Sequence, residues 1–447
     1  MHLISNQGSE RATCDSGKII SCERKTHVLW QDATREGYLN RVRSYDHSAG
    51  AWTEPVTLNT GVDNHARAVM TIDHDGCLHV ILGSHGSDVT WRRSVKPHDS
   101  SQWTDLETVG AGTYPVFICD RENTLYLTLR HQAPGARDIG VDLYARPRDG
   151  QWKKKARIVS RADEYWKTYA AYHLQMVAAP DGALHALIDF YEGQDEHGRG
   201  LHQAVCYMRS GDGGATWQKA DGTPVHTPAR PEGMDIFARN IKSRHEKMPP
   251  PEIKNGGMVL DSKGRPFAFF VNHSEKPGQL LLATVGGSGV WQHRPLSILE
   301  ETWPDMRATE CTTTIRNDDT ICALVTLTPF NDAWQDGKPT RAMQMNERAD
   351  QHLVWLVSSD GGKIFAIHRV LEPGKAFNCP SVEKPAGANI IPADRLPRVV
   401  YFDGSKGYPG GGDYYDRSKT VAEILQSDAL RQTNVFLAGG QDFREDG

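Results

Sequence analysis

The chain has 447 residues, of which 38% are hydrophobic and 24% charged, a composition typical of a globular protein. Its net charge of −5 and its lack of a long basic run argue against nucleic acid as a partner. It has no run of about 18 apolar residues, so we expect no membrane-spanning helix and no membrane partner. Residues 1–18 lack the apolar centre of a secretory signal, so we expect a cytoplasmic protein, or a secreted or periplasmic one if the chain is a mature form.

A turn motif recurs along the chain. An acidic residue or a lysine, then glycine, asparagine or aspartate, precedes a short apolar strand, in copies that begin at Asp75, Glu122, Asp181, Lys263 and Asp318. Because a short apolar run also precedes each turn, every copy predicts a β-hairpin.

Aromatic residues end successive hairpin units, and their spacing suits propeller blades that carry insertions. These residues are Trp52, Trp103, Trp152, Trp217, Trp291 and Phe365. Together with a last sheet over 380–437, they predict an all-β fold: a single seven-bladed β-propeller over residues 1–447, with antiparallel four-stranded blades. We expect a rim insertion near 219–252, a short helix near 419–431, and an N-terminal strand that completes the last blade.

Two of the aromatic residues end a sharper motif. Residues 210–217 read SGDGGATW and fit the Asp-box pattern SxDxGxTW, and residues 358–365 are a degraded copy. In such a turn the aspartate binds backbone amides, glycines take positive φ, and the aromatic side chain packs between sheets. The motif therefore supports the fold and indicates no chemistry.

The eight cysteines are scattered without CxxC pairs, which in a chain of this length favours free thiols over a disulfide framework. His202 and Cys206 lie four residues apart on a predicted strand, hence on one face of it. A structural metal ion at this place is an alternative, although further ligands cannot be named.

Candidate site residues converge at matching places in three neighbouring hairpin units. His65 enters the first strand of one hairpin and His85 leaves the second, so both imidazoles are expected at one rim. Tyr114 and Arg130 repeat this arrangement in the next unit, and Tyr172 begins the same strand of the following unit. The neighbouring residues expected to bind substrate are Asn64, Arg67 and His173.

These segments resemble a known family. The pattern DNH…GSH around His65 and His85, and the TYP sequence around Tyr114 followed by Arg130, are similar to motifs of the BNR-type propellers that include ulvan lyases and rhamnosyl-glucuronate lyases. The sequence WRRSVKP at 91–97, followed by Trp103, resembles a blade ending of that family. The resemblance runs from about residue 26 to 220, and beyond it only generic propeller features remain.

The resemblance implies β-elimination on a glycan that contains uronic acid, of the rhamnose–uronate type, with a 4,5-unsaturated product. Arg130 would pair with the uronate carboxylate, and His65 or His85 would remove the C5 proton. Tyr114, Tyr172 or the second histidine would protonate the leaving oxygen. No cofactor is required by this scheme, and we expect a monomer or a small homo-oligomer.

Two other function classes remain as alternatives. A sialidase-like hydrolase also carries Asp-boxes, but it would need three carboxylate-binding arginines, a Tyr/Glu pair and an N-terminal Arg-Ile-Pro signature, which is missing. A non-catalytic glycan-binding propeller would need none of the proposed catalytic groups. Only a lyase generates an unsaturated sugar that absorbs in the ultraviolet.

Overall fold

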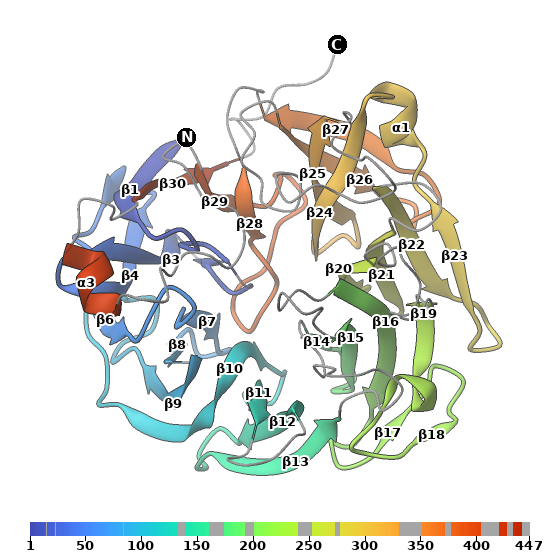
Figure 1. Ribbon diagram of the computed structural model, residues 1–447, viewed down its shortest axis with the longest axis horizontal. Coiled ribbons are helices and arrows are strands. Elements are labelled where there is room, and N and C mark those ends of the chain that lie inside the picture. The colour runs from blue at the N-terminus through green and yellow to red at the C-terminus, as the bar shows by residue number, and fades with distance from the viewer. Residues whose placement is uncertain are drawn as a thin grey trace. The chain divides into compact units, whose positions relative to one another are not determined.

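The computed structural model describes residues 1–14, 16–22, 24–83, 85–132, 139–160, 174–192, 201–239, 253–272, 278–329, 351–371, 377–403, 420–426 and 432–439. The chain divides into two compact units. The first unit contains Met1–Thr113, Thr314–Pro329 and Pro339–Gly447, and the second contains Tyr114–Thr313 and Phe330–Lys338. Antiparallel sheets make up both units, which confirms the all-β prediction (Figure 1). No helix in the described part of the chain is long and apolar enough to cross a membrane.

The first unit contains one large sheet and two smaller sets of strands. The strands of the large sheet are β1 (His2–Gly8), β2 (Ile19–Cys22), β3 (Lys25–Thr34), β4 (Gly37–Asp46), β5 (Ala51–Trp52), β6 (Val56–Gly61), β28 (Asn378–Val382), β29 (Val399–Asp403) and β30 (Thr433–Ala438). The smaller sets are β7 (Val69–Ile72), β8 (Leu78–Leu82), β9 (His85–Arg93) and β10 (Glu107–Cys119), and β25 (Ile321–Pro329), β26 (His352–Ser358) and β27 (Ala366–Leu371). The large sheet has the order β28-β29-β30-β1-β3-β4-β5, with β2 paired to β3 and β6 to β4.

Strand β1 joins segments from the two ends of the chain. It pairs antiparallel with β30, and Figure 1 draws the two strands side by side near the N label. In this pairing His2 lies opposite Leu437 and Gly8 opposite Thr433. On its other side, Gly8 lies opposite Asp32 of β3. The prediction that an N-terminal strand completes the last sheet is confirmed, and this pairing covers the edge that β30 would otherwise expose.

The second unit also consists of antiparallel strands. They are β11 (Leu125–Gln132), β12 (Ile139–Arg146), β13 (Lys153–Val159), β14 (Leu174–Ala178), β15 (Leu184–Glu192), β16 (Leu201–Ser210), β17 (Trp217–Gln218), β18 (Pro224–Val225), β19 (Asp235–Arg239), β20 (Ile253–Leu260), β21 (Pro266–Asn272), β22 (Gln279–Val285), β23 (Trp291–Pro295) and β24 (Met306–Ile315). Strands β10 and β24 each contain a point where the chain passes from one unit to the other. Strand β19 lies in the range predicted as an insertion, and it pairs with β16.

The helices in the described residues are short. They are η1 (Pro231–Gly233), α1 (Ile298–Thr302) and α3 (Val421–Gln426). Helix α3 lies within the range 419–431 where the sequence predicted a helix. Its Leu425 packs against Ala33 and Tyr38 of β3 and β4.

The five predicted hairpin turns share one backbone feature. In each, one residue has a φ between 59° and 89°, the left-handed region that favours glycine, asparagine and aspartate. These residues are Gly76, Asn123, Gly182, Gly264 and Asp319. The recurring turn motif is therefore a local backbone requirement, and the hairpins predicted from it are confirmed.

The Asp-box at 210–217 forms the turn expected of it. The Asp212 carboxylate accepts hydrogen bonds from the Thr216 hydroxyl at 2.6 Å and the Thr216 amide at 2.9 Å, and Ser210 Oγ donates to it at 2.8 Å. The bonds from Thr216 lower the pKa of Asp212 to about 2. Trp217 then packs in a buried apolar cluster of the second unit. The second copy repeats the pattern, with Asp360 accepting from the Ile364 amide at 3.0 Å.

The apolar core lies between neighbouring sheets. In the first unit, Leu29, Val42, Met70 and Val80 meet in one cluster, formed by strands of the large sheet and of the β7–β8 hairpin. None of the eight cysteines forms a disulfide bond, and five of them are buried. The sheets thus hold the loops at their ends in fixed positions.

Candidate functional site

The loop between β6 and β7 is held from two sides. Asp63 Oδ1 accepts hydrogen bonds from the amides of His65 at 2.7 Å and Ala66 at 3.1 Å, which folds the loop into a tight turn. Gln31 of β3 donates to the carbonyl oxygens of Asp63 and Ala66, both at 3.2 Å. Asn40 of β4 donates to the Ala66 carbonyl at 2.9 Å. Interior strands therefore determine where Asp63 and His65 lie.

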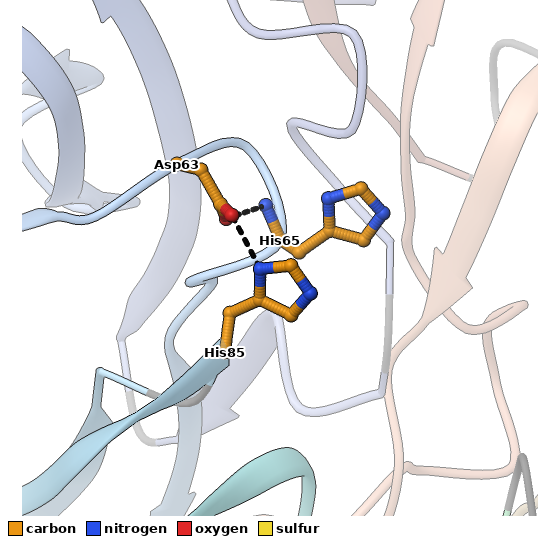
Figure 2. Close-up of side chains that lie close together, drawn as sticks. All are labelled: Asp63, His65 and His85. Carbon is orange, nitrogen blue, oxygen red and sulfur yellow. Dashed lines mark hydrogen bonds and ion pairs between the residues drawn. The ribbon is translucent and has the colours of Figure 1, made fainter. Parts of the chain in front are cut away.

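The two histidines of the DNH…GSH pattern meet. His85 opens β9, and its ring stacks on that of His65 with the centroids 4.7 Å apart and the planes 18° from parallel. Figure 2 shows that Asp63 joins them: one carboxylate oxygen binds the backbone amide of His65, and Oδ2 binds Nδ1 of His85. Asp63 was missing from the predicted site residues, although its place two residues before His65 was the signal that could have indicated it.

This contact determines which nitrogen of His85 carries the proton. An ionised carboxylate only accepts hydrogen bonds, so Nδ1 of His85 donates, and in the neutral ring the lone pair lies on Nε2. Burial raises the pKa of Asp63, but the bond from His85 and the amides of His65 and Ala66 outweigh it and lower the pKa overall. The His85 side chain is 35% exposed and that of Asp63 13%. The pair therefore offers the lone pair of His85 Nε2 as a base, while the largely buried carboxylate of Asp63 binds the opposite side of the ring.

The same three residues have the spacing of a metal site, since their ligand atoms lie within 4.8 Å of one another. However, an imidazole binds a metal through a lone pair in the plane of its ring. Stacked rings direct these lone pairs side by side and not toward one point. Nδ1 of His85 is also engaged by Asp63. The arrangement therefore suits proton transfer better than metal coordination.

Asn64 and Arg67, the predicted substrate-binding residues, face the interior of the first unit. Their exposed fractions are 0% and 2%. Nδ2 of Asn64 lies 3.4 Å from Oε2 of Glu10, which is itself buried. Both side chains are therefore almost fully covered by the protein in this structure.

Tyr114 and Arg130 form a contact in the second unit. The Arg130 guanidinium carbon lies 4.4 Å from the centroid of the Tyr114 ring, a cation–π distance. Tyr114 has a φ of 54°, a left-handed conformation that is costly for a residue with a side chain and is found mostly where function or tight packing demands it. A planar guanidinium can bind a carboxylate through two parallel N–H groups, so Arg130 is suited to that role.

Two predicted residues, Tyr172 and His173, lie outside the described residues. The alternative metal position, His202 and Cys206 of β16, belongs to the described residues. Nδ1 of His202 is 3.0 Å from Oδ2 of Asp189, while Cys206 lies in an apolar cluster where burial raises the pKa of its thiol. Because metals bind the thiolate, these surroundings do not favour a metal ion there.

Comparisons with known proteins agree with the resemblance read from the sequence. A sequence model described as "BNR repeat-containing family member" matches residues 25–299. A protein named Ulvan Lyase-PL25 from Pseudoalteromonas sp. (strain PLSV) is 28% identical over 134 residues, covering 24% of this chain and 27% of that protein. An ulvan lyase from Alteromonas sp. (strain LOR) is similar to the same extent. The chain thus matches about a quarter of the length of these curated relatives.

Solved structures share the fold over almost the whole chain. A structure titled as a new family of polysaccharide lyase, PL25 ulvan lyase, has a TM-score of 0.65 at 18% identity and covers 90% of this chain and 92% of its own. The polysaccharide lyase Uly1 has a TM-score of 0.57 at 11% identity and covers 95% of this chain and 90% of its own. At these identities the likeness concerns the fold alone.

Proposed function

Because the chain belongs to the BNR repeat-containing family, as its motifs predicted, we propose that it is a polysaccharide lyase that acts on a glycan containing uronic acid. The curated relatives carry the name ulvan lyase, and one solved structure with the same fold is titled as bound to -[GlcA(1-4)Rha3S]-. We propose a rhamnose–uronate linkage as the substrate and β-elimination as the reaction.

The observation that carries this proposal is the bond between Asp63 and Nδ1 of His85. The C5 proton of a uronate is weakly acidic, and a neutral imidazole is a competent base at neutral pH. In our proposal Nε2 of His85 removes this proton. The electrons of the C5–H bond form the C4–C5 double bond, and the C4–O bond breaks. Asp63 keeps the ring in the required tautomer and stabilises the imidazolium that forms.

Arg130 and Tyr114 complete the proposed chemistry. The guanidinium would pair with the uronate carboxylate and stabilise the charge that builds up on it when the C5 proton leaves. The Tyr114 ring orients the guanidinium through their contact at 4.4 Å. The leaving oxygen would take its proton from Tyr114, Tyr172 or His65. These assignments rest on the family motif together with the contacts within each unit.

We further propose that the sheets close into a seven-bladed propeller. The β1–β30 pairing supports this, because the joining of chain ends in one sheet is a usual device of closed repeat folds. The five turns with a left-handed residue support a repeated hairpin unit.

The experiment that tests the function follows ultraviolet absorbance while the purified chain is incubated with rhamnose–uronate glycans, including ulvan. We expect absorbance to rise with a 4,5-unsaturated uronyl product identified by mass spectrometry, and we expect His85→Ala to abolish the rise while the variant remains folded. New reducing ends without an unsaturated product would identify a hydrolase instead. Saturable binding without any cleavage would identify a glycan-binding protein.

A further inference from the structure

A cavity of about 560 Å³ lies in the first unit, and neither Asp63 nor His85 lines it. Within the described residues its wall contains three arginines and three histidines but a single carboxylate, that of Asp394. Its volume falls in the range of about 300–1,000 Å³ that is usual for small-molecule sites. A cavity with this lining is suited to a negatively charged ligand.

The cavity and the loop of the candidate active site contact different parts of strand β3. Thr26 lines the cavity, whereas Gln31 binds the loop that carries Asp63. Five residues of extended strand, at about 3.3 Å each, separate the two positions by about 16 Å. The cavity is therefore a separate site on the first unit.

Two of the three arginines in the wall are neutralised. Arg395 forms two bonds of 2.7 Å with the carboxylate of Glu383, which is buried behind the wall. Arg316 binds Asp318 at 2.9 Å. These ion pairs stabilise the wall of the cavity, and the carboxylates of Glu383 and Asp318 each bind an arginine.

Arg398 differs from both. Its guanidinium donates to the hydroxyl of Ser21 at 3.1 Å and to Nε2 of His47 at 3.4 Å, and its nearest distance to an oxygen of Glu383 is 3.8 Å. The side chain is only 19% exposed. The guanidinium is thus largely buried, its hydrogen-bond partners are neutral, and it shares the single carboxylate of Glu383 with Arg395. A buried cation that shares its carboxylate in this way favours an additional anion beside it.

His47 lies close to the positive charges of Arg398 and Arg395. Its Nε2 accepts the bond from Arg398, so the ring is neutral in this arrangement. Burial lowers the pKa of His47, and the charges of Arg398 and Arg395 lower it further.

We propose that this cavity binds the oxyanion of a small polar ligand, with Arg398 as the principal contact. The shared chemistry is a sulfate ester, a phosphate or a sugar carboxylate, each of which a guanidinium can bind through two parallel hydrogen bonds. The ligand would be bound independently of the proposed lyase reaction.

The test is isothermal titration calorimetry at constant ionic strength with three probes: inorganic sulfate, inorganic phosphate and D-glucuronate. We expect saturable binding of at least one probe, weakened about tenfold or more in Arg398→Gln, because a charge-assisted hydrogen bond is lost. The matched control is Arg265→Gln, since Arg265 is an exposed arginine of the second unit whose partner is Asp261. This control should bind like the unaltered protein.

A second measurement does not depend on the variant folding. In the unaltered protein the bound probe should slow hydrogen exchange at 395–398 and at 45–47, and leave 63–66 unchanged. Binding of sulfate or phosphate alone, or of glucuronate alone, would support the proposal and identify the source of the oxyanion. The proposal would be overturned by no saturable binding, by equal affinity in folded Arg398→Gln, or by protection confined to 63–66.

Discussion

Two pairs of aspartate and histidine lie a short distance apart in the sequence, and their surroundings differ. Asp73 binds Nε2 of His79 at 2.9 Å, with both side chains less than 10% exposed and the His79 ring stacked on Trp91. His85 is 35% exposed, and it is paired through Nδ1 to Asp63. The first pair is part of the interior, whereas the second leaves its other nitrogen available to a substrate.

This difference predicts opposite outcomes for the same substitution. In Asp63→Asn, the amide would donate to Nδ1 of His85 and place the ring proton on Nε2, where the base is needed. We expect kcat to fall about 100-fold or more, with a much smaller change in KM. Asp73→Asn should lower the melting temperature and leave kcat unchanged. Steady-state kinetics with thermal unfolding measure both effects.

A purely structural role for Asp63 would give a different result. The two variants would then lose stability alike, and the folded fraction of Asp63→Asn would turn over substrate at the normal rate. That outcome would remove Asp63 from the mechanism and reopen the choice between His65 and His85 as the base.

At the scale of elements, short polar turns hold the hairpins together. The Asp-box turn depends on one ionised carboxylate, because Asp212 accepts bonds from the hydroxyl and amide of Thr216. The pKa of Asp212 is lowered from 3.8 to about 2 by these bonds. A carboxylate with a depressed pKa stabilises the folded state at any pH above its unfolded value and loses that contribution as pH falls through the folded value.

We therefore expect Asp212→Asn to lower the melting temperature at neutral pH, and the difference from the unaltered protein to shrink between about pH 4 and pH 2. Thermal unfolding across this range is the measurement. Asp149→Asn, at another exposed turn position, is the matched control and should show no such trend. A difference that stays constant down to pH 2 would mean that the charge of Asp212 does not stabilise the turn.

At the scale of the whole molecule, the pairing of β1 with β30 joins the beginning of the chain to its end. Gly8 lies in this pairing at a place with no room for a side chain: a Cβ atom there would lie 2.5 Å from Val435 and 2.8 Å from Thr433. A larger residue must displace these two side chains, and its Cβ atom would also lie 3.1 Å from the carbonyl oxygen of Thr433. The β1–β30 contact would then be disturbed and the edge of β30 less well covered.

Gly8→Ala should accordingly destabilise the protein by about 1–3 kcal/mol, the usual cost of overpacking, and increase aggregation. Gly287→Ala is the matched control, since nothing lies within 4 Å of a Cβ atom at that position. Chemical denaturation and light scattering measure the two effects. If both variants unfold alike, the β1–β30 contact contributes little to the stability of the fold.

The repeated turns and the Asp-boxes could be predicted from the sequence because both are local: a left-handed residue or a turn aspartate acts on residues within a few positions of itself. The same holds for the DNH…GSH pattern, in which one hairpin brings its ends together. The family also followed from these short motifs, since each is a run of neighbouring residues or a fixed spacing.

Only the tertiary structure decided the roles of side chains whose partners are distant in sequence. Burial of Asn64 and Arg67 against the interior, and the engagement of Asp63 with His85, depend on which strands pack around the loop. The same is true of Arg398, which meets Ser21 and His47 from the far end of the chain. Such contacts depend on the complete fold, because the burial of a side chain and the charges near it come from every segment that packs around it.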